Sequence, residues 1–426
     1  MVDIRPFRAI RYTEQAGDPK NLITQPYDKI DNDLQKEYYK KSAYNYCRLI
    51  LPMEENKYEI ARQRTQKWMR EGILAKDEEP AVFVCRQEFE LFGRTCIRTG
   101  LIAALRLYPY NENVVFPHEV TYEEPKADRL NMLRTVQKDL EPVFLIFSDP
   151  EKRAINFFAE ITKTQPLIEV EDSFRIKHAV WRVVDSQKIK LVQKALEGKV
   201  LVITDGHHRY ESALAYRDER RMQEEWTEDS AFNFHMSYMV PVQDEGLVVL
   251  PTHRLLKKFE LASDTLQKLS KFFAISEIDP TVEALEGFLE SHKKEHVFCV
   301  YDGSKVAYGL LLRNEKTVSE LVNAGDSKKA HLLDVVILRD VVFKTIMDTG
   351  ELKIDEDILY VGSTGSVLEK VDSGEAKLAF LVNCIDPETV WQIAQKHERL
   401  PEKSTDFYPK PVSGLTMMDI APEEKL

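Results

Sequence analysis

Cysteine is scarce in this sequence and follows no recognisable pattern. The 426 residues hold five cysteines, an odd number, and no two of them form a Cys-x-x-Cys pair. Neither a zinc ribbon nor a disulfide framework is therefore predicted. Scattered cysteines are typical of a reducing compartment, so we expect a cytoplasmic protein.

Long apolar runs and an excess of basic charge are also lacking. No apolar run approaches the roughly 18 residues of a membrane-spanning helix, and residues 1–7 lack the apolar core of a signal peptide. Lys and Arg total 59 against 71 Asp and Glu, a net charge of −12, which disfavours the basic face that nucleic-acid binding needs. We expect neither a nucleic-acid nor a membrane partner, and the sequence makes no prediction of the oligomeric state.

The rest of the composition is typical of a globular protein with an α/β fold. Hydrophobic residues make up 43% and charged residues 31% of the chain, and its length allows two or three domains. Hydrophobic patterning predicts antiparallel strands at 81–89 and 95–107 and an amphipathic helix at 58–71. The fold class that follows is α/β with mixed (α+β) sheets.

Two organisational predictions complete the outline. The pattern of predicted helices and strands changes after Lys257, so we predict two regions. Residues 1–256 form a nucleotide-binding region, and residues 257–426 form a C-terminal α/β lobe whose last loop returns to the binding site of the first region. The run at 44–50 (Tyr-Asn-Tyr-Cys-Arg-Leu-Ile) predicts a further strand.

The junction between residues 200 and 217 carries the strongest functional signal. Its apolar, β-branched run at 200–203 predicts a buried strand, Asp205-Gly206 predicts a tight turn, and the residues from His208 onward favour a helix. Free N–H groups at a helix N-terminus attract anions. The pattern therefore predicts a phosphate-binding turn.

The side chains at this junction support the same interpretation. Arg209 offers a fork of donors that fits phosphate or carboxylate, and His207 and His208 add donors that titrate near neutral pH. In the alternative interpretation, Asp205 only caps the helix and the histidines are surface polar residues. A zinc site is disfavoured because adjacent helical residues point about 100° apart.

A second polar cluster lies at 117–130, on a predicted loop that enters a helix. Glu119 is a candidate general base or Mg²⁺ ligand, and Lys126 and Arg129 are candidates to neutralise phosphate charge. The alternative is a helix start with solvent-facing charge pairs, in which Asp128 suits the helix dipole.

These motifs resemble one family. The box Asp205-Gly206-His207-His208-Arg209-Tyr210-Glu211 looks like the hallmark of the domain-of-unknown-function-1015 family, and its Gly-x-x-Arg core is similar to the phosphate-binding box of the ParB/sulfiredoxin superfamily. The family match extends to further segments at 26–28, 45–49, 118–121, 126–130, 251–254 and 403–410.

The resemblance implies a ParB/sulfiredoxin-like phosphate-binding core elaborated by additional α/β lobes. That superfamily includes chromosome-partitioning CTPases, sulfiredoxin and a free-serine kinase. The matching segments make Arg48, His118 and His253 candidate substrate contacts, although a structural ion pair is an equal alternative for Arg48. The tail supplies candidates for a second anion contact, or else a C-terminal strap packed by its aromatic residues: Lys403, Ser404, Thr405 and Lys410.

Three functions are consistent with these residues. The first is a nucleotide-dependent phosphotransferase, serine kinase-like, that uses ATP or ADP and acts on a small hydroxyl-bearing metabolite. Glu119, Asp205 and His208 are its candidate catalytic residues, the phosphates bind at 206–209, and Mg²⁺ lies at Asp205 or Glu119 because Asp205 would otherwise repel phosphate. The alternatives are a nucleotide-gated regulatory protein of the ParB type and a hydrolase or lyase that uses a histidine base.

Overall fold

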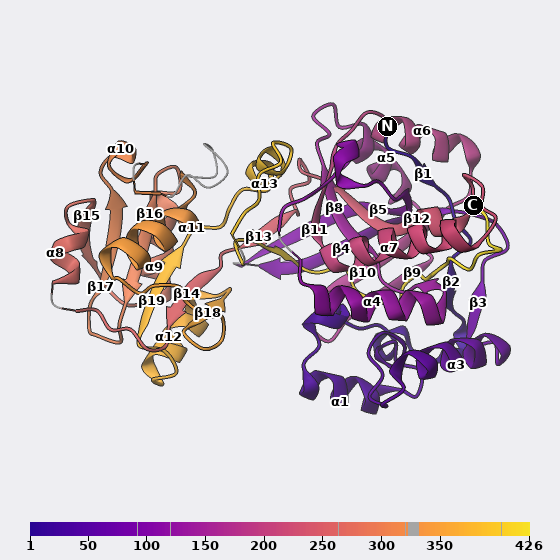
Figure 1. The fold of residues 1–426 in the computed structure, drawn as a ribbon, viewed down its shortest axis with the longest axis horizontal. Helices are drawn as coiled ribbons and strands as arrows, with labels where there is room; N and C mark the ends of the chain where they lie inside the picture. The colour runs from indigo at the N-terminus through magenta and orange to yellow at the C-terminus, as the bar shows by residue number, and fades with distance from the viewer. Residues whose placement is uncertain (92, 120, 263, 320, 323–331, 402) are drawn as a thin grey trace. The chain divides into compact units, whose positions relative to one another are not determined.

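The computed structural model describes residues 1–426 except 92, 120, 263, 320, 323–331 and 402. The chain forms two compact units (Figure 1). Unit 1 comprises Met1–Val248 together with Pro409–Leu426, and unit 2 comprises Val249–Tyr408. The C-terminal segment Pro409–Leu426 thus packs with the N-terminal part of the chain.

Unit 1 is organised around one mixed sheet. Its strand order is β6-β11-β8-β12-β5-β4-β10-β9, with β1 paired to β5. The pairs β11–β6 and β12–β8 are parallel and the others are antiparallel. The strands are β1 (Ile4–Arg5), β4 (Val82–Leu91), β5 (Arg94–Arg106), β6 (Val115–Pro117), β8 (Val143–Phe147), β9 (Ile168–Glu171), β10 (Lys177–Val183), β11 (Leu201–Asp205) and β12 (Phe234–Pro241).

Helices and two short strand pairs complete unit 1. The central strands β8, β11 and β12 are buried along their whole length, as expected for apolar strands covered on both faces. Helix α4 packs against α7 and α3 (Figure 1). The helices are α1 (Asn32–Lys41), α2 (Cys47–Ile50), α3 (Lys57–Arg70), α4 (Glu123–Val136), α5 (Arg153–Ile161), α6 (Ser186–Leu196) and α7 (His207–Gln223), and the strand pairs are β2 (Ile10–Tyr12) with β3 (Leu74–Lys76) and β7 (Lys138–Asp139) with β21 (Met418–Asp419).

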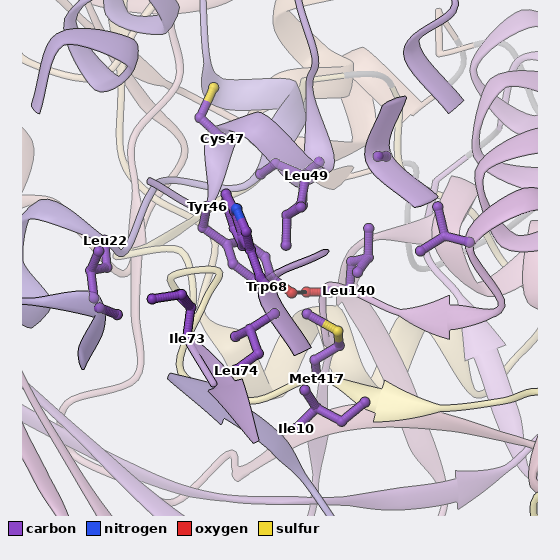
Figure 2. Close-up of a cluster of buried hydrophobic side chains, with 14 of the residues drawn as sticks. Ile10, Leu22, Tyr46, Cys47, Leu49, Trp68, Ile73, Leu74, Leu140 and Met417 are labelled. Atoms are coloured by element: carbon purple, nitrogen blue, oxygen red, sulfur yellow. Dashed lines mark hydrogen bonds between the residues drawn. The ribbon is translucent and has the colours of Figure 1, made fainter. Parts of the chain in front are cut away.

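The helices α1 to α3 enclose a separate apolar cluster. Figure 2 shows Tyr46 and Trp68 within it, and Met417 of the C-terminal segment beside Ile10. The Ile10 N–H donates to the Met417 carbonyl at 2.8 Å, and the Tyr46 hydroxyl donates to the Leu140 carbonyl at 2.7 Å. The C-terminal segment is therefore held at Met417, which bonds to Ile10 and packs in this cluster.

The strand predicted at 44–50 is wrong, because the chain forms the short helix α2 there. The Asn45 side chain accepts a hydrogen bond from the Cys47 N–H at 3.0 Å and donates to the Asn21 carbonyl at 2.8 Å. Such local side-chain bonds compete with strand pairing and favour a helix start. The predicted elements at 58–71, 81–89 and 95–107 are confirmed as α3, β4 and β5.

Unit 2 contains a six-stranded antiparallel sheet in the order β15-β17-β16-β19-β14-β18, and β13 pairs with β20. Its strands are β13 (Val248–Leu250), which starts at the boundary, β14 (His253–Leu256), β15 (Phe273–Ile278), β16 (Val297–Tyr301), β17 (Ala307–Leu312), β18 (Ile358–Val361), β19 (Leu378–Val382) and β20 (Asp406–Tyr408). Its helices are α8 (Thr265–Leu269), α9 (Val282–Ser291), α10 (Glu315–Ser319), α11 (Asp334–Ile337), the π-helix η7 (Leu338–Ile346), α12 (Thr364–Asp372) and α13 (Pro387–Ala394).

The chain as a whole is a mixed α/β protein, as predicted. Among the described residues, no helix is both long and apolar enough to span a membrane.

Candidate functional site

The predicted strand, turn and helix at 200–217 are present as β11, Gly206 and α7. Gly206 adopts the left-handed conformation with φ of 90°. A Cβ atom built there would lie 2.9 Å from Nε of Arg209, closer than side chains pack. Glycine is therefore required at this turn both for its backbone angle and because the Arg209 guanidinium lies across it.

The helix N-terminus carries no cap from any side chain in the described part of the chain. Asp205, which could have capped it, pairs with two cations: its Oδ2 accepts from Arg209, and its Oδ1 lies 3.1 Å from Nζ of Lys410. Asp205 thus does not act as a simple helix cap. Helix α7 has 17 residues, and the free N–H groups of its first turn lie next to the positively charged side chains of Arg209 and Lys410.

Electrostatics keep this cluster ionised although it is buried. Burial tends to raise the pKa of Asp205, but Lys410 and Arg209 outweigh it and hold that pKa well below its usual value. Burial tends to lower the pKa of Arg209, and Asp205 and Glu141 raise it above its usual value. Nη1 of Arg209 donates to the Pro142 carbonyl at 2.5 Å, while its Nε has no hydrogen-bond partner among the described residues.

Three histidines meet at the same junction. The His118 N–H donates to Nε2 of His207 at 3.3 Å, and the Tyr122 N–H donates to Nε2 of His208 at 3.0 Å. Nδ1 of His118 donates to the Ile203 carbonyl at 2.5 Å. Burial is the main cause that lowers the pKa of each histidine. All three rings are therefore neutral at pH 7, and in His207 and His208 the ring proton is on Nδ1.

The second predicted cluster lies next to these histidines. Oε1 of Glu119 is 3.6 Å from Nε2 of His118, so Glu119 lies at the junction. Nζ of Lys126 lies 2.6 Å from Glu123 and 3.4 Å from Glu211, and the Thr121 hydroxyl donates to Glu211 at 2.7 Å. The charge of Lys126 is thus paired with Glu123 on its own helix α4 and, at a longer distance, with Glu211 on α7.

Arg129 has a mainly structural environment. It binds Asp128, donates to the Ile50 carbonyl at 3.2 Å and stacks on Tyr27 at 4.0 Å. Burial tends to raise the pKa of Asp128, but Arg129 and Lys57 lower it to about 2. The charges pair with one another, as in the alternative interpretation of this segment, but Arg129 is buried rather than solvent-facing and Asp128 lies beyond the first turn of α4.

Two acidic residues near the site were not among the predicted ones. Glu141 is 3% exposed and accepts from the Tyr27 N–H and the Ser413 hydroxyl, both at 3.0 Å. With Arg129 and Arg209, it lines a cavity of about 30 Å³, which has room for one or two water molecules. The charge of Asp28 raises the pKa of Arg209 and acts in the same direction on His208. The family-like segment at 26–28 was the available signal for Asp28, and Glu141 had none.

Arg48 is held by the backbone in this structure. It donates to the carbonyls of Tyr39 and Ser42 at 2.7 and 3.1 Å and stacks on the Tyr39 ring at 4.1 Å. These bonds account for Arg48 as a local structural residue, and its substrate role stays a prediction.

The remaining predicted residues belong to unit 2. The hydroxyl of Ser404 donates to the Pro401 carbonyl at 2.5 Å, and Nδ1 of His253 accepts from the Val382 N–H at 3.2 Å. The segment predicted as one anion contact is divided, because Lys403, Ser404 and Thr405 lie in unit 2 and Lys410 lies in unit 1. Lys410 is the member of this segment that contacts Asp205.

The residues at the junction do not fit a resident Mg²⁺. Both carboxylate oxygens of Asp205 already bind cationic side chains, which would repel a metal ion. The described residues contain no group of three or more His, Cys, Asp or Glu that could hold a metal. The reason for predicting Mg²⁺, the repulsion between Asp205 and phosphate, is met here by Arg209 and Lys410.

Comparison with known proteins assigns the family. The model of the family described as Protein of unknown function (DUF1015) matches residues 4–336, and the chain belongs to that family. No curated protein matches the chain.

Solved structures show weak likeness. A mutant free serine kinase in complex with ADP is 12% identical with a TM-score of 0.35, covering 76% of this chain and 94% of that one. The free serine kinase in complex with AMP is 13% identical with a TM-score of 0.34, covering 76% and 93%. A conserved hypothetical protein from Pyrococcus furiosus is 13% identical with a TM-score of 0.32, covering 73% and 94%. At these TM-scores the likeness does not establish a shared fold.

Proposed function

We propose that the protein is a nucleotide-dependent phosphotransferase that acts on a small hydroxyl-bearing metabolite. The observation that carries the proposal is the uncapped N-terminus of α7, which stands beside the buried cations Arg209 and Lys410. N–H groups and positive side chains together are the usual environment of a bound phosphate. Lys410 and Arg209 place two positive charges in direct contact with Asp205, next to the free N–H groups of the helix.

In this proposal the phosphates of ATP or ADP bind at residues 206–209, and Lys410 contacts them from the C-terminal segment. Glu119 accepts the proton of the substrate hydroxyl. The hydroxyl oxygen then attacks the terminal phosphorus, and the bond from that phosphorus to the rest of the nucleotide breaks, releasing ADP from ATP or AMP from ADP. A phosphoryl transfer needs mainly positioning and charge stabilisation, which these fixed donors would supply.

The histidine geometry favours this reaction over a histidine-dependent hydrolase or lyase. A general base needs a free nitrogen lone pair, and Nε2 of both His207 and His208 already accepts a backbone N–H. Glu119 remains as the candidate base, since a carboxylate can accept a proton while its partner oxygen keeps another contact.

The test is a transfer assay with ATP and with ADP, each with Mg²⁺, against hydroxyl-bearing metabolites beginning with serine. We expect a phosphorylated product with one of them. A nucleotide at about 100 times its Kd should also stabilise the protein by about 2.7 kcal/mol. The proposal is wrong if no pairing of nucleotide and metabolite gives product and no nucleotide raises the unfolding temperature.

Glu119→Gln separates chemistry from binding. We expect turnover to fall by roughly 10²- to 10⁴-fold, with nucleotide binding retained. Glu123→Gln is the matched control, because Glu123 is a nearby carboxylate that is 94% exposed, and its turnover should equal that of the wild type. Equal losses in both variants would contradict the role of Glu119.

A further inference from the structure

Among the described residues of unit 2, one buried arginine has no carboxylate within ion-pair distance. Arg254 lies on β14 and is 4% exposed. One guanidinium nitrogen donates to the Thr252 carbonyl, and Nη2 lies 3.5 Å from the Lys403 carbonyl. Its ring contact is with Tyr360, at 5.6 Å. Within the described chain, no ion pair includes Arg254.

An unpaired buried charge is costly, so such a residue needs an explanation. The similarly buried Arg209 and Arg129 each pair with a carboxylate. Burial lowers the pKa of Arg254 to about 10, which still leaves it charged at pH 7. The two carbonyl acceptors use only part of its five-donor fork.

The neighbours of Arg254 add positive charge and an unused hydroxyl. Lys403, whose carbonyl faces the Arg254 fork, is itself a cation without an ion pair among the described residues. It adopts a left-handed backbone with φ of 53°, which is uncommon outside glycine. The buried Oγ1 of Thr252 has no hydrogen-bond partner among the described residues. The Arg254 guanidinium and the Thr252 hydroxyl therefore lie close together, and the one carboxylate that acts on Arg254 in the described chain, Asp334, does so from beyond ion-pair distance.

We propose that Arg254, Lys403 and the Thr252 hydroxyl form an oxyanion-binding subsite in unit 2, which takes the phosphate or carboxylate group of a small ligand. The planar fork of arginine fits either group with two parallel hydrogen bonds. Binding supplies an anion in direct contact with the guanidinium, which Asp334 does not provide. The subsite stands independently of the transfer reaction proposed for unit 1.

The test measures the affinity of the full chain for inorganic phosphate and, separately, for acetate, by titration calorimetry. All measurements use a Lys410→Met background, so that binding beside Asp205 does not contribute. We expect at least one anion to bind, and Arg254→Gln to weaken that binding by about tenfold or more. Arg254→Lys should give an intermediate loss, because lysine keeps the charge without the fork.

Two further variants keep the test decisive. Arg339→Gln is the matched control, since Arg339 is a half-exposed arginine of unit 2 already paired with Asp340 at 2.7 Å, and it should bind like the background. Lys403→Met serves if Arg254→Gln fails to fold, and should weaken binding about threefold. The anion that binds identifies the ligand group as phosphate or carboxylate. The proposal is overturned if neither anion binds. It is also overturned if Arg254→Gln and Lys403→Met bind the anion with the same affinity as the Lys410→Met background.

Discussion

The contact between Lys410 and Asp205 can be tested by replacing Lys410 with methionine, which keeps the length of the side chain and removes its charge. The two side chains are 10% and 7% exposed, and Nζ lies 3.1 Å from Oδ1. Removing one partner of a buried pair costs about 3–5 kcal/mol. Because Arg209 remains beside Asp205, we expect the lower end, about 3 kcal/mol of unfolding free energy.

The loss should depend on pH in a defined direction. Lys410 and Arg209 hold the folded-state pKa of Asp205 below its unfolded value, which is about 3.9. The pair therefore contributes its full stability above about pH 4 and loses it as the pH falls further. The difference between Lys410→Met and the wild type should be largest at pH 7 and should shrink at more acidic pH.

Thermal unfolding at pH 7 and at pH 3 measures both effects. A loss of this size corresponds to a fall of roughly 6 °C in the midpoint at pH 7. Lys177→Met is the matched control, because Lys177 forms an exposed pair with Glu88 at 2.8 Å, and exposed pairs contribute little. If Lys410→Met unfolds at the wild-type temperature, or if its deficit grows on acidification, the electrostatic account of Asp205 is wrong.

Two other predictions concern stability alone. Gly206→Ala should lower the unfolding free energy, measured in urea, by about 1–3 kcal/mol more than the control Gly198→Ala. Both glycines have positive φ, but an added Cβ meets the Arg209 guanidinium at Gly206 and open space at Gly198. Equal losses would contradict the contact with Arg209. Burial and the neighbouring Arg254 lower the pKa of His253 to about 3, below its unfolded value of about 6.5. The folded protein therefore loses stability as the pH falls below 6.5, because the unfolded chain takes up the proton more readily. Between pH 7 and pH 5 the wild type should lose about 2 kcal/mol more than His253→Asn, which keeps an acceptor for the Val382 N–H, and parallel curves would contradict it.

Local patterns predicted the elements whose signals are local. The apolar run at 200–203, Gly206 and the helix-favouring residues after it gave β11 and α7 close to their observed bounds. After Lys257 the hydrophobic pattern through Leu312 predicts the order helix, strand, helix, strand, strand, with a hairpin turn at Asp302-Gly303. The structure confirms this order, and Gly303 has a positive φ. The apolar spacing at 331–347 predicts one helix. Its first residue lies outside the described residues, and the described part contains α11 followed by a π-helix. Apolar spacing cannot distinguish π from α geometry over so few turns.

The contacts that complete the site were beyond local patterns. Asp205 and Lys410 are 205 positions apart in the sequence, and only the family resemblance suggested that they share a ligand. Glu141 gave no signal, because a single acidic residue at the start of an apolar strand usually faces solvent. Its burial follows from Tyr27 and Ser413, which close over it from two distant segments.

The C-terminal segment of unit 1 therefore has a role that neither its composition nor its position suggests. It delivers Lys410 to Asp205, Ser413 to Glu141 and Met417 to the cluster around Ile10. Until this segment packs, Asp205 lacks the contact with Lys410, and Arg209 is the cation that pairs with it directly. In the proposed function, phosphate therefore gains the charge of Lys410 only when the segment is in place. The proposal accordingly predicts that ligand binding and the docking of Pro409–Leu426 stabilise each other.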